Sequence, residues 1–510
     1  MPRSYHTLAL LKSRLTLPKS RFGAKINVMQ IPSEVKNILE ALENANFEAY
    51  AVGGCVRDLL LGAEPKDWDI TTDAKPEEVQ KLFPDSFYEN KYGTVGVKTG
   101  SDKPELGVVE ITTYRVEEKY TDKRHPDKVQ FTASLKEDLK RRDFTVNALA
   151  MRRDGKITDS FNGQEDLKNK LICAVGEAKD RFNEDALRMM RAVRLATELG
   201  FNIEEKTFQA IKDNAKSIGL IAKERVRDEL IKTIDSKNAY DGVMLLKDSG
   251  LLHVILPELA AGIGVGQNKH HIYTVFEHNT LALKWAAEHD YPFRVKLAAL
   301  LHDVGKPDTK RGDGPDSTFY GHEIVGGRIT GKILRRLRFQ IRLEHMVSML
   351  VKHHLFYYNV GEVTAKSVRR LVVKVGPENM DDLIKVRICD RMGSGVPKPE
   401  PYRLRHFQYM VEKVQKDPIS PKMLKINGSD IMKFLKIEPG PKVGQVLAIL
   451  LDEVLDEPKR NTKKYLKDKA EALRKLKDSE LDELTKKARE KGQEFEKAVD
   501  EEVKERYWVK

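Results

Sequence analysis

The spacing of hydrophobic positions changes along the chain and separates a mixed part from a helical part. Apolar residues recur at helical spacing and predict a first helix at Val35, Ile38, Leu39 and Leu42. Short β-rich runs then alternate with turns up to about residue 159, at 49–52, 68–71, 93–98 and 107–112. Helical periodicity dominates from about residue 180 onward. The pattern predicts an α+β fold with an N-terminal α/β head followed by mostly helical domains.

Clusters of glycine and proline mark the expected domain boundaries, near Gly262–Gly266 and near Pro397–Pro401. We expect a basic extension at 1–28, a head at 29–165, a helical neck and body at 166–262, a further helical domain at 263–400, a C-terminal helical segment at 401–458 and a charged helical tail at 459–510. The extension is expected to be disordered, with a targeting presequence as the alternative. The tail is expected to be a solvated helix or coiled-coil arm, with an RNA-contacting arm as the alternative.

Composition narrows the class of protein. The 510 residues are 40% hydrophobic and 33% charged, and we find no segment apolar enough to span a membrane. Three distant cysteines form no CxxC pair, which favours a reducing cytoplasm. Of the net charge of +12, residues 1–28 carry +6 and residues 459–510 carry +4. The remaining chain is close to neutral, so any affinity for a polyanion must come from local clusters.

The densest polar motif lies between residues 50 and 73, where a predicted strand runs into a glycine pair. Gly53 and Gly54 allow a ligand to approach the backbone closely. Arg57 stands beside the helix start, where its guanidinium can donate hydrogen bonds to a phosphate. Asp67 and Asp69 follow at strand spacing and are expected to point to one face. Such a pair suits Mg²⁺ bound together with substrate phosphates, and the alternative is a solvated strand face.

Two further blocks extend this predicted site. Glu110, in VVEITTYR, is a candidate third carboxylate, with a surface acid as the alternative. Arg141 and Arg142 stand at the start of an expected apolar helix, where the positive end of the helix dipole disfavours cations. Their presence there indicates that they bind a ligand such as a phosphate. Asp143 and Asn147 suit ribose hydroxyls or base edges.

A fourth block, residues 183–194, is expected to form one helix with a polar stripe. An aspartate and an arginine on such a stripe can present acceptors and donors to a base edge, and the alternative is a solvated salt-bridged face. The stripe contains Asp185, Arg188, Arg191 and Arg194.

The blocks GGCVRD, DWD, EITTYR, RRDFTVNALA and EDALRMMRAVR resemble the class II tRNA nucleotidyltransferase and poly(A) polymerase family over about residues 30–256. The resemblance implies a polymerase β-like head sheet, an RNA-binding body, and addition of CCA to tRNA 3′ ends from CTP and ATP with release of pyrophosphate. It further implies that Asp67 and Asp69 hold Mg²⁺, that Gly54, Arg57 and Arg142 position the triphosphate, and that Asp185, Arg188, Arg191 and Arg194 form the nucleotide site. Segment 114–139 resembles the loop associated with the switch from C to A addition, and segment 424–451 more loosely resembles CCA-adding members.

A second constellation lies in the helical part. His278, the pair His302-Asp303 and Asp390 offer nitrogen and oxygen ligands, and His322 and His353 are further candidates. This order resembles the HD phosphohydrolase superfamily over about residues 271–390. The resemblance implies a divalent transition metal, or Mn²⁺ or Mg²⁺, and phosphomonoesterase or phosphodiesterase chemistry. The alternative is an HD scaffold without hydrolysis.

The predicted function is therefore a CCA-adding nucleotidyltransferase with an HD phosphohydrolase activity. The alternatives are a poly(A) polymerase or an enzyme that adds only A or only CC, and an HD phosphohydrolase with an RNA-binding head. The expected partners are the 3′ end and acceptor arm of tRNA, with CTP and ATP as substrates and no membrane. The chain is expected to act as a cytoplasmic monomer or homodimer.

Overall fold

The computed structural model describes residues 31–90, 93–118, 128–268, 272–415 and 424–509. It divides the chain into two units, one with residues up to 188 together with 201–211, and one with residues 189–200 together with 212 onward. Within the described residues every strand lies in the first unit, and helices build the second. The predicted α+β fold is confirmed. No helix formed by these residues has the length and hydropathy needed to cross a bilayer.

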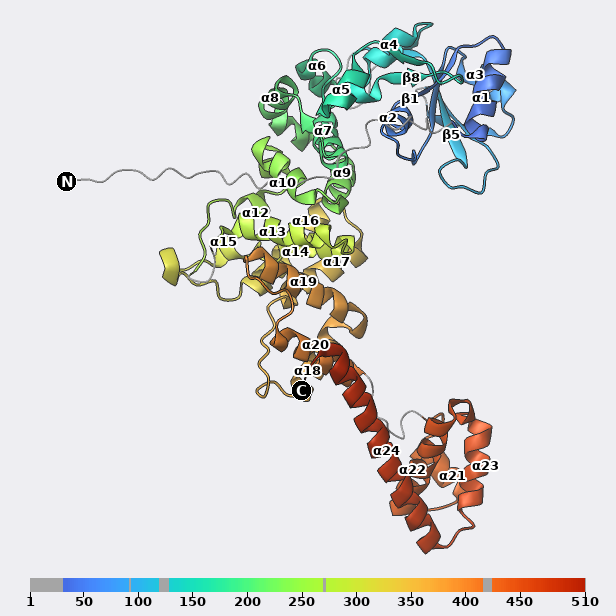
Figure 1. Ribbon diagram of the computed structural model, residues 1–510, viewed down its shortest axis with the longest axis vertical. Helices are drawn as coiled ribbons and strands as arrows, with labels where there is room; N and C mark the ends of the chain where they lie inside the picture. Colours follow the sequence, from blue (N-terminus) through green and yellow to red (C-terminus); the bar gives the residue numbers. More distant parts are fainter. Residues whose placement is uncertain (1–30, 91–92, 119–127, 269–271, 416–423, 510) are drawn as a thin grey trace, which may run out of the picture. The chain divides into compact units, whose positions relative to one another are not determined.

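The head is built on a seven-stranded sheet with the order β3-β4-β5-β2-β1-β8-β9. Strands β1, β5 and β8 of this sheet are labelled in Figure 1. Neighbouring strands are antiparallel except β2 and β5, which run parallel. Its strands are β1 (Ala49–Val52), β2 (Asp69–Thr72), β3 (Ser86–Asn90), β4 (Thr94–Lys98), β5 (Val108–Thr113), β8 (Leu149–Met151) and β9 (Ile157–Asp159). Two smaller pairs are β6 (Arg115–Glu118) with β7 (Lys128–Phe131), and β10 (Leu171–Ile172) with β11 (Asn202–Ile203). Residues 119–127 of the predicted switching loop lie outside the described residues.

Short helices accompany this sheet. The predicted apolar face of α1 is confirmed, since Val35, Ile38, Leu39 and Leu42 are all buried. The helices are α1 (Ser33–Asn44), α2 (Gly54–Leu60), α3 (Pro76–Leu82), α4 (Leu135–Lys140), the 3₁₀ turn η1 (Thr145–Asn147), α5 (Gly163–Asn169), α6 (Ala178–Glu184) and α8 (Glu205–Asn214). Helix α7 (Leu187–Leu199) begins in the first unit and continues in the second.

The second unit begins with short body helices and continues into the region where the HD motif was predicted. Its first helices are α9 (Lys223–Asp235), α10 (Ala239–Asp248), α11 (Leu251–Ile255) and α12 (Pro257–Ala260). The next are α13 (Val275–Glu288), α14 (Phe293–Leu301), α15 (Lys306–Thr309), α16 (His322–Arg336), α17 (Ile341–His353), α18 (Ala365–Val375), α19 (Met380–Gly393) and α20 (Tyr402–Gln415). Helix α13 packs against α14 and α19. A Cβ atom on Gly393 would lie 2.7 Å from the carbonyl oxygen of His278, so glycine permits this close approach.

The described residues 424–509 form four α-helices, α21 (Gly428–Leu435), α22 (Pro441–Asp456), α23 (Lys463–Leu473) and α24 (Asp478–Tyr507). They share an apolar core to which α23 and α24 contribute Leu466, Ala470, Leu473, Leu481 and Ala488. The end of α24 packs on α20 through Tyr409, Val503 and Val509. The charged tail is therefore not a wholly solvated arm, because its apolar residues fall on one helical face and join the core of the preceding segment.

Candidate functional site

Carboxylates of the head meet at adjacent strands. Strand β2 begins at Asp69, and Asp67 lies in a bend just before it, so only the second member of the predicted pair is in the strand. Trp68 and Ile70 are buried while Asp67 is exposed and Asp69 half-buried, which places the two acids on the opposite face. Glu110 on β5 is the register partner of Asp69. Register partners of parallel strands share a face, so Glu110 stands beside Asp69.

The glycine turn brings a guanidinium to these acids. Gly53 has φ +84° and ψ −133°, a conformation that L side chains rarely adopt. A Cβ atom at this position would lie 2.9 Å from Nη1 of Arg142 and 3.7 Å from Oδ2 of Asp69. The missing side chain therefore leaves the space in which Arg142 and Asp69 come together.

A chain of hydrogen bonds orients the second predicted phosphate ligand. Arg57 Nη1 donates to Oδ1 of Asn147 over 2.7 Å, and Asn147 Nδ2 donates to Oδ1 of Asp143 over 3.1 Å. Asp143 also accepts from the backbone N–H of Phe144 and is buried, as is Asn147. The pair that was expected to meet ribose or base edges thus positions Arg57. Arg57 also pairs with Asp58 at 2.7 Å.

The sequence prediction missed a buried acid that orders both arginines of the third block. Asp138 on α4 is fully buried, with Oδ1 2.8 Å from Arg141 Nη2 and Oδ2 3.7 Å from Arg142 Nη2. Its Oδ2 also accepts from the hydroxyl of Thr71, on β2. Burial alone would raise the pKa of the Asp138 carboxyl, but Arg141 and Arg142 hold that pKa below its usual range. The spacing of Asp138 three and four residues before the arginines was the signal for this role.

The expectation of a single helix over residues 183–194 is wrong. Asp185 has extended backbone and separates α6 from α7, and its Oδ1 accepts from the N–H of Leu187. Aspartate is a favoured cap because it satisfies such free N–H groups at a helix start. Arg188 nevertheless lies near Arg141, donating to its carbonyl oxygen over 3.1 Å, and pairs with Glu184. Asp185, which caps α7, and Arg188, in the first turn of α7, therefore flank the block that contains Arg141 and Arg142.

Arg191 and Arg194 lie further along α7, in the second unit. Arg194 Nε is 2.7 Å from Oε2 of the buried Glu229 on α9, and its Nη1 is 3.2 Å from Glu198. The pair with Glu229 links α7 to α9 within that unit, whereas Glu198 lies on α7 itself. The expected part of both arginines in the nucleotide site stays a prediction.

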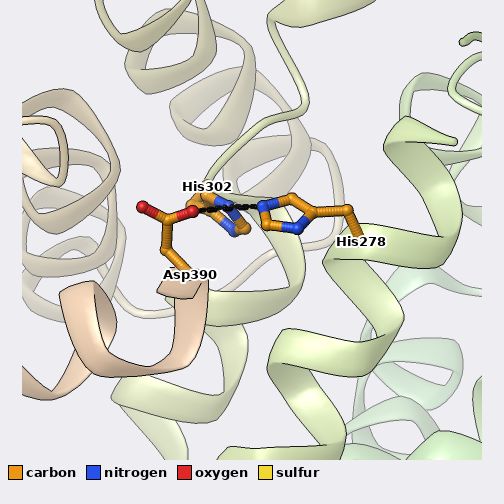
Figure 2. A group of neighbouring side chains, drawn as sticks. All are labelled: His278, His302 and Asp390. Carbon is orange, nitrogen blue, oxygen red and sulfur yellow. Dashed lines mark hydrogen bonds and ion pairs between the residues drawn. The ribbon is translucent and has the colours of Figure 1, made fainter. Parts of the chain in front are cut away.

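Four residues of the HD motif converge from three places in the sequence. Figure 2 shows three of them, His278, His302 and Asp390. His278 comes from α13, His302 and Asp303 from the end of α14, and Asp390 from α19. His278 Nε2 lies 2.9 Å from His302 Nε2, 3.3 Å from Asp303 Oδ2 and 3.2 Å from Asp390 Oδ1. The corresponding distances from His302 Nε2 to the two carboxylates are 3.4 and 3.6 Å. Two ligand atoms that each lie about 2.1 Å from the same ion, at right angles to one another, are about 3 Å apart. The distances within the cluster match this spacing.

The histidine tautomers are set by the backbone. His302, His322 and His354 each donate from Nδ1 to the carbonyl oxygen three residues earlier, over 2.8, 2.8 and 2.7 Å. With the proton on Nδ1, the lone pair of each imidazole is on Nε2. His322 Nε2 lies 3.2 Å and His354 Nε2 3.7 Å from Asp303 Oδ1, so their lone pairs face the cluster. Backbone hydrogen bonds of this kind orient metal-binding histidines.

The structure places His354 in the cluster where the sequence prediction had chosen His353. Successive residues at a helix end point about 100° apart, so only one of a histidine pair can face a given site. His354 is buried against His302, with ring centroids 5.0 Å apart. His353 is half-buried, and its pKa is lowered by burial and by Lys352 and Lys374.

The electrostatics of the cluster favour a cation. Burial opposes protonation of His302, but Asp303 and Asp390 outweigh it and raise the pKa of His302 to about 10. Burial lowers the pKa of His354 to about 3. Lys306 Nζ sits 2.6 Å from Asp303 Oδ2. Imidazole nitrogens together with carboxylate oxygens fit a divalent transition metal or Mn²⁺, which would take the place of the proton that the carboxylates favour on His302.

A cavity of about 670 Å³ opens over this cluster. Asp303, Asp390, His322 and His354 line its floor, and Lys306, Arg387 and Arg391 add positive charge to its wall. The aspartates can hold a metal ion, and the basic side chains beside them can bind an anion. This combination suits a phosphate ester.

Four family models match the chain. The "Poly A polymerase head domain" covers residues 49–173, the "Probable RNA and SrmB- binding site of polymerase A" residues 200–263, the HD domain residues 271–392, and domain 2 of tRNA nucleotidyltransferase residues 405–470. The fold and these matches define a chain with a poly A polymerase type of head joined to an HD domain. The family resemblance predicted from the sequence is confirmed. Both kinds of domain generally use divalent metals.

Curated relatives that match the chain include CCA-adding enzymes. That of Lactobacillus helveticus is 56% identical over 196 residues, which are 38% of this chain and 48% of the relative. That of Leuconostoc mesenteroides is 48% identical over 239 residues, 46% of this chain and 58% of the relative. The chain thus spans about half the length of these curated relatives.

Solved structures extend the likeness over more of the fold. The Bacillus stearothermophilus CCA-adding enzyme in complex with CTP matches 86% of this chain and 96% of its own, with a TM-score of 0.54 and 27% identity. The Thermotoga maritima CCA-adding enzyme complexed with tRNA shares the fold, with a TM-score of 0.51, 19% identity, and coverage of 88% of this chain and 98% of its own.

Proposed function

We propose that the head adds C, C and A to tRNA 3′ ends from CTP and ATP. The observation that carries the proposal is the placement of Asp69 and Glu110 as register partners next to Arg142, in a head whose relatives are CCA-adding enzymes. The tRNA 3′-hydroxyl would attack the α-phosphate, the new bond joining its oxygen to phosphorus while the bond to pyrophosphate breaks. Asp185 and Arg188 would read the edge of the incoming base.

The carboxylate oxygens of Asp67, Asp69 and Glu110 are hard donors that fit Mg²⁺. When bound, Mg²⁺ supplies positive charge that stabilises the attacking and leaving oxygens. Arg57 and Arg142 would hold the triphosphate, with Asn147 and Asp138 keeping the guanidinium groups in place.

Incubation of the full chain with tRNA lacking its last three nucleotides, Mg²⁺ and labelled CTP or ATP tests this proposal. Wild type should incorporate both, and Asp69→Asn should lose at least a hundredfold in rate. Asp85→Asn is the matched control, because Asp85 is an exposed head acid whose carboxylate forms an ion pair with Lys98 across 3.7 Å. Incorporation of C alone or of A alone would identify an enzyme that adds only part of CCA. Incorporation of long A tails would identify a poly(A) polymerase. Incorporation that survives Asp69→Asn would overturn the site.

We propose a second activity for the HD domain, the metal-dependent hydrolysis of phosphate monoesters. The convergence of Nε2 and carboxylate atoms below a cationic cavity supports it. His278, His302, Asp303 and Asp390 would hold a divalent transition metal, or Mn²⁺ or Mg²⁺. A water oxygen would bond to phosphorus as the ester oxygen leaves with a proton, which yields an alcohol and inorganic phosphate.

Phosphate release from glycerol 2-phosphate, measured with Mn²⁺, Ni²⁺, Co²⁺ and Mg²⁺ in turn, tests the second activity. Asp390→Asn should abolish it while leaving nucleotide incorporation intact. No release with any of these ions would leave the HD domain as a scaffold.

We also propose a cytoplasmic location, which the free thiols of Cys55, Cys173 and Cys389 support. Imaging of the tagged chain would check it.

A further inference from the structure

A second cavity lies next to the one over the HD cluster. It measures about 490 Å³, and the two cavities share Leu355, Arg387 and Arg391 in their lining. The two guanidinium groups thus form a common wall. Arg387 and Arg391 stand one turn apart on α19, on either side of Asp390.

The walls of this second cavity combine aromatic rings with arginines. Phe356, Tyr357, Tyr358 and Phe407 line it, and the rings of Phe356 and Phe407 stack with centroids 4.3 Å apart. Arg403 is its third guanidinium, and none of its described lining residues is acidic. Two carboxylates outside the lining contact residues of its wall: Glu362 accepts from the hydroxyl of Tyr357, and Asp390 accepts from Arg387. A cavity that is both aromatic and cationic matches a ligand that is both flat and anionic.

The shared wall has unused hydrogen-bonding capacity. Arg387 donates from Nη1 to Oδ2 of Asp390 over 2.6 Å, and Arg391 donates from Nη2 to the carbonyl oxygen of Lys398. Nε of Arg391 is buried and finds no hydrogen-bond partner among the described residues. A buried donor without a partner costs free energy unless a ligand satisfies it.

We propose that the second cavity is a nucleotide subsite of the HD domain, which binds the penultimate nucleotide of an oligonucleotide whose terminal phosphate lies at the metal cluster. The base stacks in the aromatic cavity, and its phosphodiester is bound by Arg391 and Arg403. This inference rests on the proposed phosphohydrolase activity and names its substrate class, since a small phosphate ester bound over the cluster would leave Arg403 and the aromatic wall uncontacted.

Binding of the dinucleoside monophosphate ApA to the full chain by calorimetry, in EDTA, tests the subsite without hydrolysis. ApA has a phosphodiester and no terminal phosphate, so it probes the second cavity alone. The titration is made in the Arg57→Ala background, which removes nucleotide binding at the head. We expect ApA to bind at least tenfold more tightly than adenosine or glycerol 3-phosphate, because only ApA offers both a base and a phosphodiester.

Arg403→Ala and Tyr357→Ala should each weaken ApA binding by about tenfold. Both residues are exposed, so their truncation should leave the fold intact. Arg370→Ala, which removes an exposed arginine of α18 outside both cavities, should change nothing. Equal binding of ApA and adenosine, or ApA binding unaffected by Arg403→Ala, would overturn the subsite. The phosphohydrolase proposal fails separately, by absence of phosphate release from glycerol 2-phosphate, which does not use this cavity.

With Mn²⁺ present, a dinucleotide with a 3′-terminal phosphate should be hydrolysed with a kcat/KM at least tenfold above that for glycerol 2-phosphate. Arg403→Ala should remove this advantage and leave the rate on glycerol 2-phosphate unchanged. Loss of both rates together would overturn the assignment, because it would indicate a structural role for Arg403.

Discussion

Arg141 Nη2 lies 2.8 Å from Oδ1 of Asp138, a carboxylate with no exposed surface. The same carboxylate reaches Arg142 and Thr71, so one buried charge connects the third sequence block to strand β2. A buried charge needs such partners, because removal from water costs several kcal/mol.

Asp138→Ala should therefore lower the free energy of unfolding of the head by about 3–5 kcal/mol, the usual cost of leaving buried partners unpaired. The KM for CTP should rise as well, since Arg142 loses an anchor. Chemical denaturation and initial-rate kinetics measure the two effects. Glu137→Ala, which removes a partly exposed neighbour paired with Lys140, should be close to neutral.

The stability of the head should depend on pH through Asp138. Its folded-state pKa is depressed, so its contribution is present above the unfolded-state pKa of about 4 and is lost as pH falls through the folded pKa. Between about pH 5 and pH 3, wild type should lose more stability than Asp138→Asn does. Parallel denaturant titrations of the two proteins check this, and equal slopes would show that Asp138 does not titrate differently on unfolding.

Gly53→Ala should reduce nucleotide incorporation at least a hundredfold. The new Cβ atom would lie 2.9 Å from Arg142 Nη1 in a backbone conformation that disfavours side chains. Gly100→Ala is the matched control, because Gly100 also has positive φ but no atom lies within 4 Å of its Cβ position. If both variants lose activity equally, backbone strain rather than the approach of Arg142 is responsible.

Arg194→Ala should destabilise the second unit by about 3 kcal/mol, because it leaves the buried carboxylate of Glu229 without its 2.7 Å partner. Glu229→Gln should recover part of that loss in the double variant, which a double-mutant cycle would measure. A variant that is stable but defective in nucleotide binding would instead support the predicted nucleotide-site role of Arg194.

His354→Ala should weaken Mn²⁺ binding to the chain by about 10–100-fold, the usual effect of removing a group that supports a metal site. His353→Ala should leave the affinity unchanged, because His353 does not face the cluster. Calorimetric titration of the metal-free chain distinguishes the neighbours. A larger loss of Mn²⁺ affinity in His353→Ala than in His354→Ala would instead support His353, the residue predicted from the sequence.

Much of the candidate chemistry could be predicted from the sequence, since it depends on residue types and short spacings. Strand alternation predicted an acid pair at Asp67 and Asp69, although only Asp69 lies in a strand. The grouping of His278, His302, Asp303 and Asp390 was predicted from the resemblance to the HD superfamily, because local geometry cannot bring together residues of separate helices.

Tertiary structure decided what local spacing leaves open. Asp185 caps a helix although its spacing fits a helical stripe, because the chain turns there and the free N–H of Leu187 needs an acceptor. The choice of His354 over His353 depends on how α17 packs, and the role of Asp138 on which side chains surround it after folding. The cavity with Arg391 and Arg403 is formed by segments distant in sequence, and its charge and shape exist only once they pack together.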